Sequence, residues 1–243
     1  MRDRLILLPG WGLGTAPLEP LADALRGLDE RLRVQVEPLP TLSSCDPAEW
    51  LDELDDSLPQ DAWLGGWSLG GMLAAELAGR RGERCPGLLT LASNPRFVAG
   101  SAWPGAMSAE TFAVFRQGCA TDAAVTLKRF ALLCSQGAAD PRGLSRLLLG
   151  AAPQVAPESL LAGLDVLAAL DTRAALQSFA GPQLHLFAGL DGLVPADAAA
   201  ALLALLPDVE IGLIDTASHA FVLERPHEVA AAIQAFLHEA GDD

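Results

Sequence analysis

The sequence predicts an α/β fold in which helices cover both faces of a mostly parallel sheet. The 243-residue chain contains six short apolar runs, and amphipathic segments lie between most of them. We interpret each run as a strand that is apolar on both faces, as a parallel sheet covered by helices on both sides requires. Hydrophobic residues make up 51% of the chain and charged residues 19%, so a large core can form and global disorder is excluded. The length favours one domain with an insertion.

The expected elements alternate along the chain. Strands are predicted at residues 4–8, 32–37, 62–66, 87–91, 183–188 and 209–214. Helices are predicted at 17–27, 47–58, 70–82, 195–206 and 225–239, and several of them have proline near the first turn, where its missing N–H costs little. Alternating strands and helices predict right-handed crossovers.

Residues 98–179 break this alternation. They contain no convincing strand, and their apolar spacing is helical at 110–116, 123–134 and 144–149. We expect a helical cap over the carboxyl edge of the sheet, where open α/β sheets bind ligands. The core would then consist of residues 1–97 and 180–243.

A candidate nucleophile lies between the third predicted strand and the helix after it. Residues 66–70 read Gly-Trp-Ser-Leu-Gly, the G-x-S-x-G pattern of a nucleophile elbow. The elbow holds its serine at positive φ, which requires glycine two residues before and two after it. The following helix N-terminus favours negative charge there. We therefore predict that Ser68 is a nucleophile; the alternative is a glycine-rich turn with an incidental serine.

A serine that attacks an ester carbonyl needs two N–H donors for the developing oxyanion. The backbone N–H of Leu69, directly after the serine, is one candidate. The loop after the first strand, Leu-Pro-Gly-Trp-Gly at residues 8–12, offers the other, and the N–H of Trp11 is best placed. A simple turn is the alternative interpretation of this loop.

The general base must be one of four histidines. His185 lies inside a predicted strand, which favours a packing role. His227 starts a helix and His238 lies near the chain end, where solvent exposure is expected. His219 lies in a loop that leaves the last strand, at the edge where Ser68 is expected. We therefore predict that His219 is the base.

The acid that orients the base should lie between serine and histidine in the chain. Asp191 follows the fifth strand in a short loop and is the first choice. Asp197 would lie in the first turn of a helix, and Asp215 is too close to His219. In this scheme His219 takes the proton of Ser68, and Asp191 selects the histidine tautomer and stabilises the imidazolium.

The charge balance excludes some classes of partner. The net charge of −15 argues against binding of the whole chain to nucleic acid or to an anionic membrane. The four cysteines show no metal-ligand spacing, which favours a reduced, cytoplasmic location. We expect no metal and no cofactor.

These motifs identify the chain as similar to the α/β-hydrolases, and further matches narrow the resemblance to the pimeloyl-[acyl-carrier protein] methyl ester esterases of biotin biosynthesis. The resemblance covers almost the whole chain. The matching core stretches are residues 10–13, 64–71, 91–95, 190–195 and 217–220, and the matching cap stretches are 103–105, 129–132 and 163–167. The cap matches and the placement of Trp11 and Trp67 are more specific than the widely shared hydrolase motifs.

The resemblance implies a substrate and its contacts. The substrate would be a methyl-capped pimeloyl chain on acyl-carrier protein, hydrolysed through an acyl-enzyme. The residues implied to contact it are Trp11, Ser68, Leu69, Phe130, Ala131, Leu132, Leu133, Cys134 and His219. The residues implied to contact the carrier are Arg129, Arg142 and Arg146; a fourth basic position of the family is Val125 here, with Lys128 close by.

The local charge independently favours an acidic partner. Residues 111–150 carry five basic and two acidic side chains, a net charge of +3 in a chain whose total is −15. Arg142 and Arg146 are four residues apart and share one face if they lie on a helix. Four of the five basic residues are arginines, which suit bidentate contacts with carboxylate and phosphate. Ordinary solvated charge is the alternative.

The sequence also departs from that family. Pro9 replaces a histidine found in many relatives, and residues 38–44 replace a glycine-rich loop. The chain begins at the family's third strand, so about six strands are expected. Alternative functions are a carboxylesterase for small free esters, a non-catalytic binding protein, and a C–C bond hydrolase or haloperoxidase-like enzyme, because the fold alone fixes no substrate.

Overall fold

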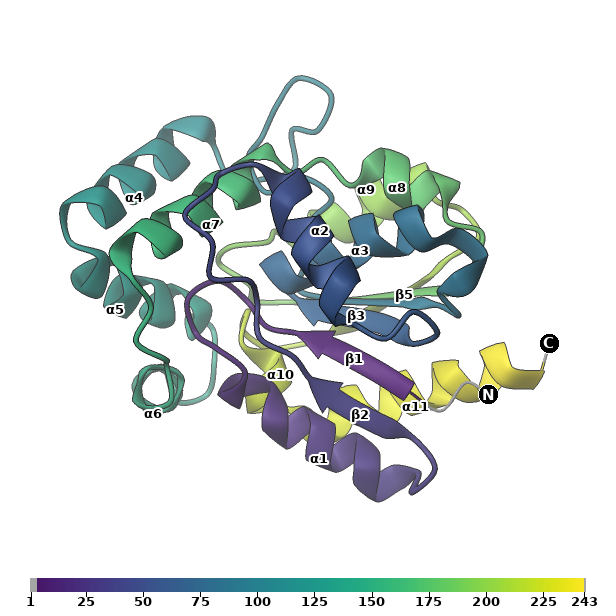
Figure 1. Ribbon diagram of the computed structural model, residues 1–243. Helices are drawn as coiled ribbons and strands as arrows, with labels where there is room; N and C mark the ends of the chain where they lie inside the picture. Colours follow the sequence, from purple (N-terminus) through teal and green to yellow (C-terminus); the bar gives the residue numbers. More distant parts are fainter. Residues whose placement is uncertain (1–3, 243) are drawn as a thin grey trace.

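The computed structural model describes residues 4–242, which contain one six-stranded, wholly parallel sheet (Figure 1). The strand order is β2-β1-β3-β4-β5-β6. The strands are β1 (Arg4–Leu8), β2 (Arg33–Val36), β3 (Trp63–Trp67), β4 (Leu88–Leu91), β5 (Gln183–Ala188) and β6 (Glu210–Ile214). Each lies within one residue of its predicted range, so the predicted fold class is confirmed.

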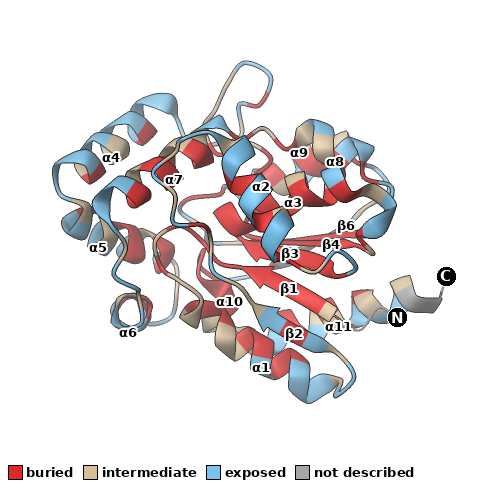
Figure 2. Cartoon of the chain, in the orientation of Figure 1, coloured by how far each residue is buried: buried red, intermediate tan, exposed pale blue. Residues whose placement is uncertain are grey.

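The central strands are buried and the outer strands are not. Every residue of β3, β4 and β5 is buried, and so are four of the five residues of β1. The expectation that all six strands are covered on both faces is wrong for β2 and β6, which expose Arg33 and Leu213 (Figure 2). These strands form the two edges of the sheet, where each has a neighbouring strand on one side only.

Two layers of helices cover the sheet (Figure 1). One layer holds α1, α10 and α11, and the other holds α2, α3, α8 and α9. Their bounds are α1 (Glu19–Leu28), α2 (Pro47–Ser57), α3 (Leu69–Arg81), α8 (Arg173–Ser178), α9 (Asp197–Leu205), α10 (Phe221–Glu224) and α11 (Pro226–Asp242), with 3-10 turns at Ala16–Leu18 and Gly82–Arg84. Within residues 4–242, no helix combines the length and the apolar character that a bilayer crossing demands.

Four helices lie beyond the carboxyl ends of the strands (Figure 1). They are α4 (Ala109–Thr121), α5 (Ala123–Cys134), α6 (Pro141–Gly150) and α7 (Pro157–Ala169). Ser108, Asp122 and Asp140 each accept a backbone N–H at the start of one of these helices, which is why α4, α5 and α6 begin where they do. Helices α4, α5 and α6 match the helical segments predicted from the sequence, whereas α7 was not predicted.

Helices α5 and α7 contact the loop after β1. The indole N–H of Trp11 donates to the carbonyl of Leu160 on α7 at 2.8 Å. Gly12 adopts a φ of +70°, and a Cβ there would come within 2.8 Å of Leu127 on α5. Helix α8 instead packs against α3, where Gly79 meets Ala175. The division into core and cap stays a prediction, and its residues 1–3 and 243 lie outside the described range.

Candidate active site

Ser68 lies at a strained turn between β3 and α3. Its φ of 56° is in the region that L residues rarely adopt, and such strain costs about 1–3 kcal/mol. The surroundings hold it there: the Ser68 N–H donates to the carbonyl of Leu91 at 2.9 Å. The Ser68 carbonyl accepts the N–H of Gly71 at 3.0 Å and the hydroxyl of Ser93 at 2.7 Å. The G-x-S-x-G segment therefore forms the elbow that its pattern predicts.

Close backbone packing explains the glycines of the motif. A Cβ on Gly66 would lie 2.2 Å from the backbone of Gly70, and a Cβ on Gly70 would lie 2.2 Å from the carbonyl oxygen of Leu8. Real Cβ atoms do not approach so closely, so only glycine fits at either position. The second contact also presses the start of α3 against the end of β1. The two segments with the predicted oxyanion donors are therefore adjacent.

The backbone N–H groups of the two predicted oxyanion donors, Trp11 and Leu69, have no hydrogen-bond partner among residues 4–242. Leu69 is the first residue of α3, so its N–H has no partner within the helix. In residues 4–242 neither this N–H nor the backbone N–H of Trp11 donates to another group. Their role in stabilising an oxyanion stays a prediction, which their adjacent segments and free N–H groups support.

His219 and Asp191 form a buried pair. Nδ1 of His219 lies 2.7 Å from Oδ2 of Asp191, and both side chains are fully buried. The other oxygen of Asp191 accepts the backbone N–H groups of Leu193 at 2.7 Å and Val194 at 2.9 Å, which fixes the carboxylate. Because a carboxylate only accepts, Nδ1 is the donor in this pair, and in the neutral form of the ring Nε2 is then the acceptor.

The second ring nitrogen of His219 is buried and has no partner. Nε2 makes no hydrogen bond to any described residue. Buried polar atoms without partners are rare, and each needs an explanation. The histidine backbone is tied to the elbow, since the indole N–H of Trp67 donates to the His219 carbonyl at 2.9 Å. Trp67 immediately precedes Ser68.

The structure thus brings together part of the predicted triad. Asp191 and His219 are hydrogen-bonded to each other, and Trp67, the residue before Ser68, donates to the backbone carbonyl of His219. No hydrogen bond joins Nε2 of His219 to Ser68. The backbone carbonyl of Cys134, at the end of α5, accepts the N–H of Ala220 at 3.0 Å and so holds the loop that carries His219. No sequence signal pointed to this contact.

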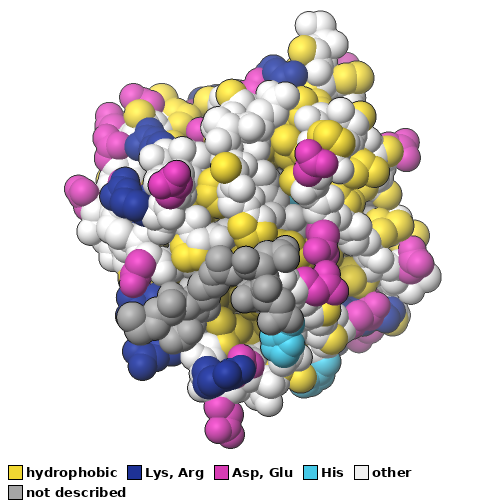
Figure 3. Space-filling model, turned by 90° about the vertical axis from the view of Figure 1, so that its right-hand side faces the viewer, with side chains coloured by type: hydrophobic (Ala, Val, Ile, Leu, Met, Phe, Trp, Pro, Cys, Tyr) yellow, Lys and Arg dark blue, Asp and Glu magenta, His cyan; other side chains and the backbone are white. Residues whose placement is uncertain are grey.

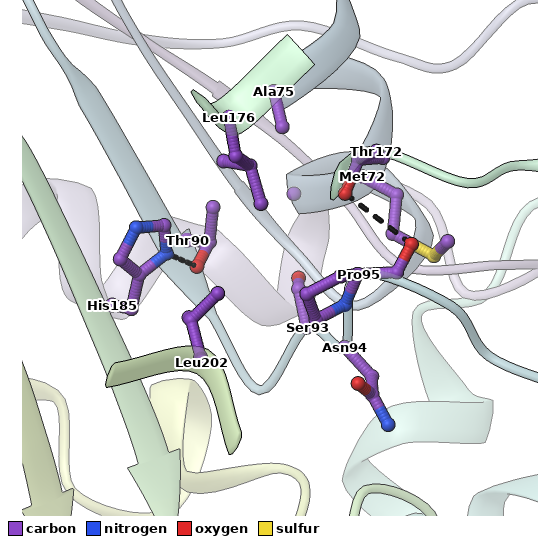
Figure 4. Close-up of a pocket in the computed structure, with 11 residues that line it drawn as sticks. Met72, Ala75, Thr90, Ser93, Asn94, Pro95, Thr172, Leu176, His185 and Leu202 are labelled. Atoms are coloured by element: carbon purple, nitrogen blue, oxygen red, sulfur yellow. Dashed lines mark hydrogen bonds between the residues drawn. The ribbon is translucent and has the colours of Figure 1, made fainter. Parts of the chain in front are cut away.

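His185 has a structural environment, as its place in a strand predicts. It lies on β5, and its Nδ1 is 2.6 Å from the hydroxyl of Thr90 on β4 (Figure 4). Both line a cavity of about 10 Å³ beside Met72 and Ser93, behind the elbow. Burial lowers the pKa of His185 from 6.5 to about 3. The ring is therefore neutral in the folded protein near neutral pH.

This depressed pKa predicts acid sensitivity. The unfolded chain binds a proton at His185 below about pH 6.5, whereas the folded chain does so only near pH 3, so stability falls as the pH drops between these values. At pH 5 the loss is about 2 kcal/mol. We expect His185→Gln to remove this component, measured as the change in unfolding free energy between pH 7.5 and pH 5. His238→Gln, on the exposed surface, should not change it; equal effects of both variants would contradict the assignment.

The residues implied to contact the acyl chain occupy different surroundings. Trp11 packs edge-on against Phe130 at 5.0 Å between ring centroids. Phe130 and Leu133 line an enclosed apolar cavity of about 50 Å³ between α4, α5 and α7. Leu132 is half exposed and lines an open groove of about 410 Å³ with Arg129. Ala131 and Cys134 are fully buried. Their contacts with substrate stay predictions.

The basic residues implied to contact a carrier are exposed and without ion-pair partners. They are Lys128, Arg129, Arg142 and Arg146. Within residues 4–242 none of them forms a salt bridge, whereas Arg116 of the same region pairs with Asp165. Figure 3 shows the face of the molecule opposite helices α4–α7, where acidic, basic and hydrophobic side chains are interspersed.

Comparison with known proteins connects this site to a family. The model of the "Alpha/beta hydrolase family" matches residues 5–232. The chain is 36% identical to the pimeloyl-[acyl-carrier protein] methyl ester esterase of Aromatoleum aromaticum, over 96% of this chain and 97% of that one. It is 35% identical to the biotin biosynthesis bifunctional protein BioHC of Cellvibrio japonicus, over 97% of this chain. The chain spans about half the length of such bifunctional relatives, 47% in that case.

Solved structures agree on the fold. A hydrolase from Oleispira antarctica superposes with a TM-score of 0.84 at 14% identity, over 98% of this chain and 92% of that chain. At this identity the likeness concerns the fold alone. The match over residues 5–232 and the 36% identical relative show that the chain belongs to the α/β-hydrolase family. They also confirm its resemblance to the pimeloyl-[acyl-carrier protein] methyl ester esterases.

Proposed function

We propose that this protein is a serine esterase that hydrolyses the methyl ester of pimeloyl-[acyl-carrier protein] in biotin biosynthesis. The observation that carries the chemistry is the buried His219, bonded to Asp191 through one nitrogen and unpartnered at the other, beside the elbow of Ser68. The printed names of the relatives supply the substrate and the pathway. An acyl-carrier protein is accordingly the partner.

The first half of the reaction forms an acyl-enzyme. Nε2 of His219 takes the hydroxyl proton of Ser68 while Oγ attacks the ester carbonyl carbon, and Asp191 stabilises the resulting imidazolium. The carbonyl oxygen becomes an oxyanion, which accepts the N–H groups of Trp11 and Leu69. The imidazolium then returns its proton to the methoxy oxygen. The bond from carbon to methoxy oxygen breaks, and methanol leaves.

The second half frees the carboxylate. A water molecule attacks the acyl-enzyme carbonyl as His219 takes one of its protons, and the same N–H groups stabilise the second oxyanion. The bond between the acyl carbon and Ser68 Oγ breaks, and His219 returns a proton to that oxygen. The products are pimeloyl-[acyl-carrier protein] with a free carboxyl group and an unmodified enzyme.

Exposed, unpaired arginines on the cap support docking of an acidic carrier. Acidic side chains outnumber basic ones by 31 to 16, so unpaired basic residues stand out in this chain. Such a patch raises the rate of encounter with an oppositely charged partner, and salt screens that attraction. A small uncharged ester gains nothing from the patch.

We therefore expect salt to separate the two kinds of substrate. Raising NaCl from 50 to 500 mM should lower kcat/KM for the carrier-linked methyl ester about 10-fold and for free dimethyl pimelate less than 2-fold. Arg142→Glu should act like added salt on the carrier-linked ester, whereas Arg33→Glu, an equal charge change on β2, should not. Equal salt sensitivity of both esters, or a strong preference for the free ester, would favour a small-ester carboxylesterase.

A further inference from the structure

A carboxylate outside the predicted triad contacts the histidine loop. Glu224 is the last residue of α10, the four-residue helix that begins just after His219. The helix turns the chain back, so that Oε2 of Glu224 accepts both the backbone N–H of Ser218 at 3.0 Å and its hydroxyl at 2.8 Å. Ser218 is fully buried and immediately precedes His219. Glu224 is thus the shared acceptor for both donors of that residue.

The loop before His219 needs such an anchor. Thr216 has a φ of 54°, a conformation that L residues rarely adopt and that persists only when the surroundings enforce it. Two buried donors of Ser218 would lose their acceptor without Glu224, and hydrogen bonds to a charged acceptor are stronger than neutral ones. The other oxygen of Glu224 lies 3.4 Å from the N–H of Ala139, in the loop between α5 and α6. The carboxylate therefore contacts the cap side as well.

Each other contact of the histidine fixes a different atom. Asp191 orients the ring through Nδ1, Trp67 holds the backbone carbonyl, and Cys134 holds the N–H of the next residue. Glu224 holds the N–H and the hydroxyl of Ser218, the residue before His219, and the carbonyl of Ser218 accepts the N–H of Phe221 at 3.0 Å. Loss of this contact would let the chain leading into the histidine shift while the other contacts remain. A displacement of about 1 Å in a catalytic group can lower a rate by about 100-fold.

We propose that Glu224 is a positioning residue for His219: through Ser218 it holds the loop that carries the histidine, so that the ring stays where proton transfer from Ser68 requires it. This inference rests on the proposed function, because it assumes that His219 is the base. Glu224 touches neither substrate nor the reacting atoms. Its removal should therefore lower the rate of the chemical step and leave substrate binding unchanged.

The test compares kcat and KM for hydrolysis of p-nitrophenyl butyrate. Glu224→Ala should lower kcat about 30- to 100-fold with KM within 2-fold of the native enzyme. Glu224→Gln should stay within about 5-fold, because its amide oxygen can accept both donors of Ser218. Ser218→Ala should lower kcat only slightly in the otherwise native enzyme, and it should not lower kcat further when added to Glu224→Ala. Glu228→Ala is the matched control, since its carboxylate pairs with Arg225 on the surface.

Three results would overturn the inference. They are a kcat for Glu224→Ala within 2-fold of native, a glutamine variant as impaired as the alanine variant, and a loss that appears in KM instead of kcat. If Glu224→Ala does not fold, Glu224→Asp takes its place: the shorter side chain cannot reach both donors of Ser218, so kcat should fall at least about 10-fold with KM unchanged, and a kcat within 2-fold of native would overturn the inference. Ser68→Ala is measured in parallel. If it retains activity, the proposed function has failed. If it loses activity while Glu224→Ala keeps the native kcat, only the positioning role has failed.

Discussion

Replacing Ser68 with alanine is expected to lower kcat/KM for the carrier-linked methyl ester by about 10⁴-fold or more. The change removes the oxygen that accepts the acyl group, so hydrolysis can proceed only by attack of water beside the oxyanion donors. The smaller side chain fits the elbow, because the contacts that enforce its positive φ involve backbone atoms of residue 68. Methanol release from the carrier-linked ester measures the loss.

The matched control is Ser178→Ala, a serine on the exposed end of α8. It should hydrolyse the ester at the native rate. Thermal unfolding of both variants should remain close to native, since neither change opens a cavity in the core. If Ser68→Ala kept a kcat/KM within 10-fold of native, the nucleophile would be another group.

Asp191→Asn is expected to lower kcat by about 10⁴-fold while the fold remains intact. The asparagine oxygen can keep the N–H bonds of Leu193 and Val194, which leaves the NH2 group facing Nδ1 of His219. A donor at this place forces Nδ1 to accept, so the ring proton moves to Nε2. That tautomer cannot take a proton from Ser68.

Asp197→Asn is the control for this substitution. The sequence predicts Asp197 in the first turn of a helix, and the structure places it at the start of α9. Its amide variant should keep kcat, measured as steady-state hydrolysis of the same ester from pH 6 to pH 9. A severe loss in Asp197→Asn together with native kcat in Asp191→Asn would reverse the two assignments.

The sheet was predictable because its strands carry a strong signal. The runs that became β1, β3 and β4 are short and almost wholly apolar, as strands of a covered parallel sheet are. The edge strands were found too, although Arg33 and Leu213 face solvent there. Helix α7 was missed, because its sequence is apolar nearly all round and shows little amphipathic pattern.

In the candidate site, too, some features could be predicted from the sequence and others could not. Ser68, Asp191 and His219 could be proposed from the sequence because each follows a predicted strand, and parallel strands bring their carboxyl ends to one edge. The contacts of Trp67, Cys134 and Glu224 were not predictable. The contacts of Trp67 and Cys134 depend on how segments distant in the chain fold against one another, and the contact of Glu224 depends on the turn that α10 makes after His219. No spacing rule describes either kind of contact.

The most direct test of the central claim is the site of covalent labelling by an organophosphorus fluoridate such as diisopropyl fluorophosphate. The claim predicts one diisopropylphosphoryl group per chain, with fluoride released, mapped by peptide mass spectrometry to Ser68. It also predicts that His219→Gln lowers the labelling rate at least 100-fold, because the hydroxyl then lacks its base. Labelling at a different residue, or at Ser68 with undiminished rate in His219→Gln, would contradict the account.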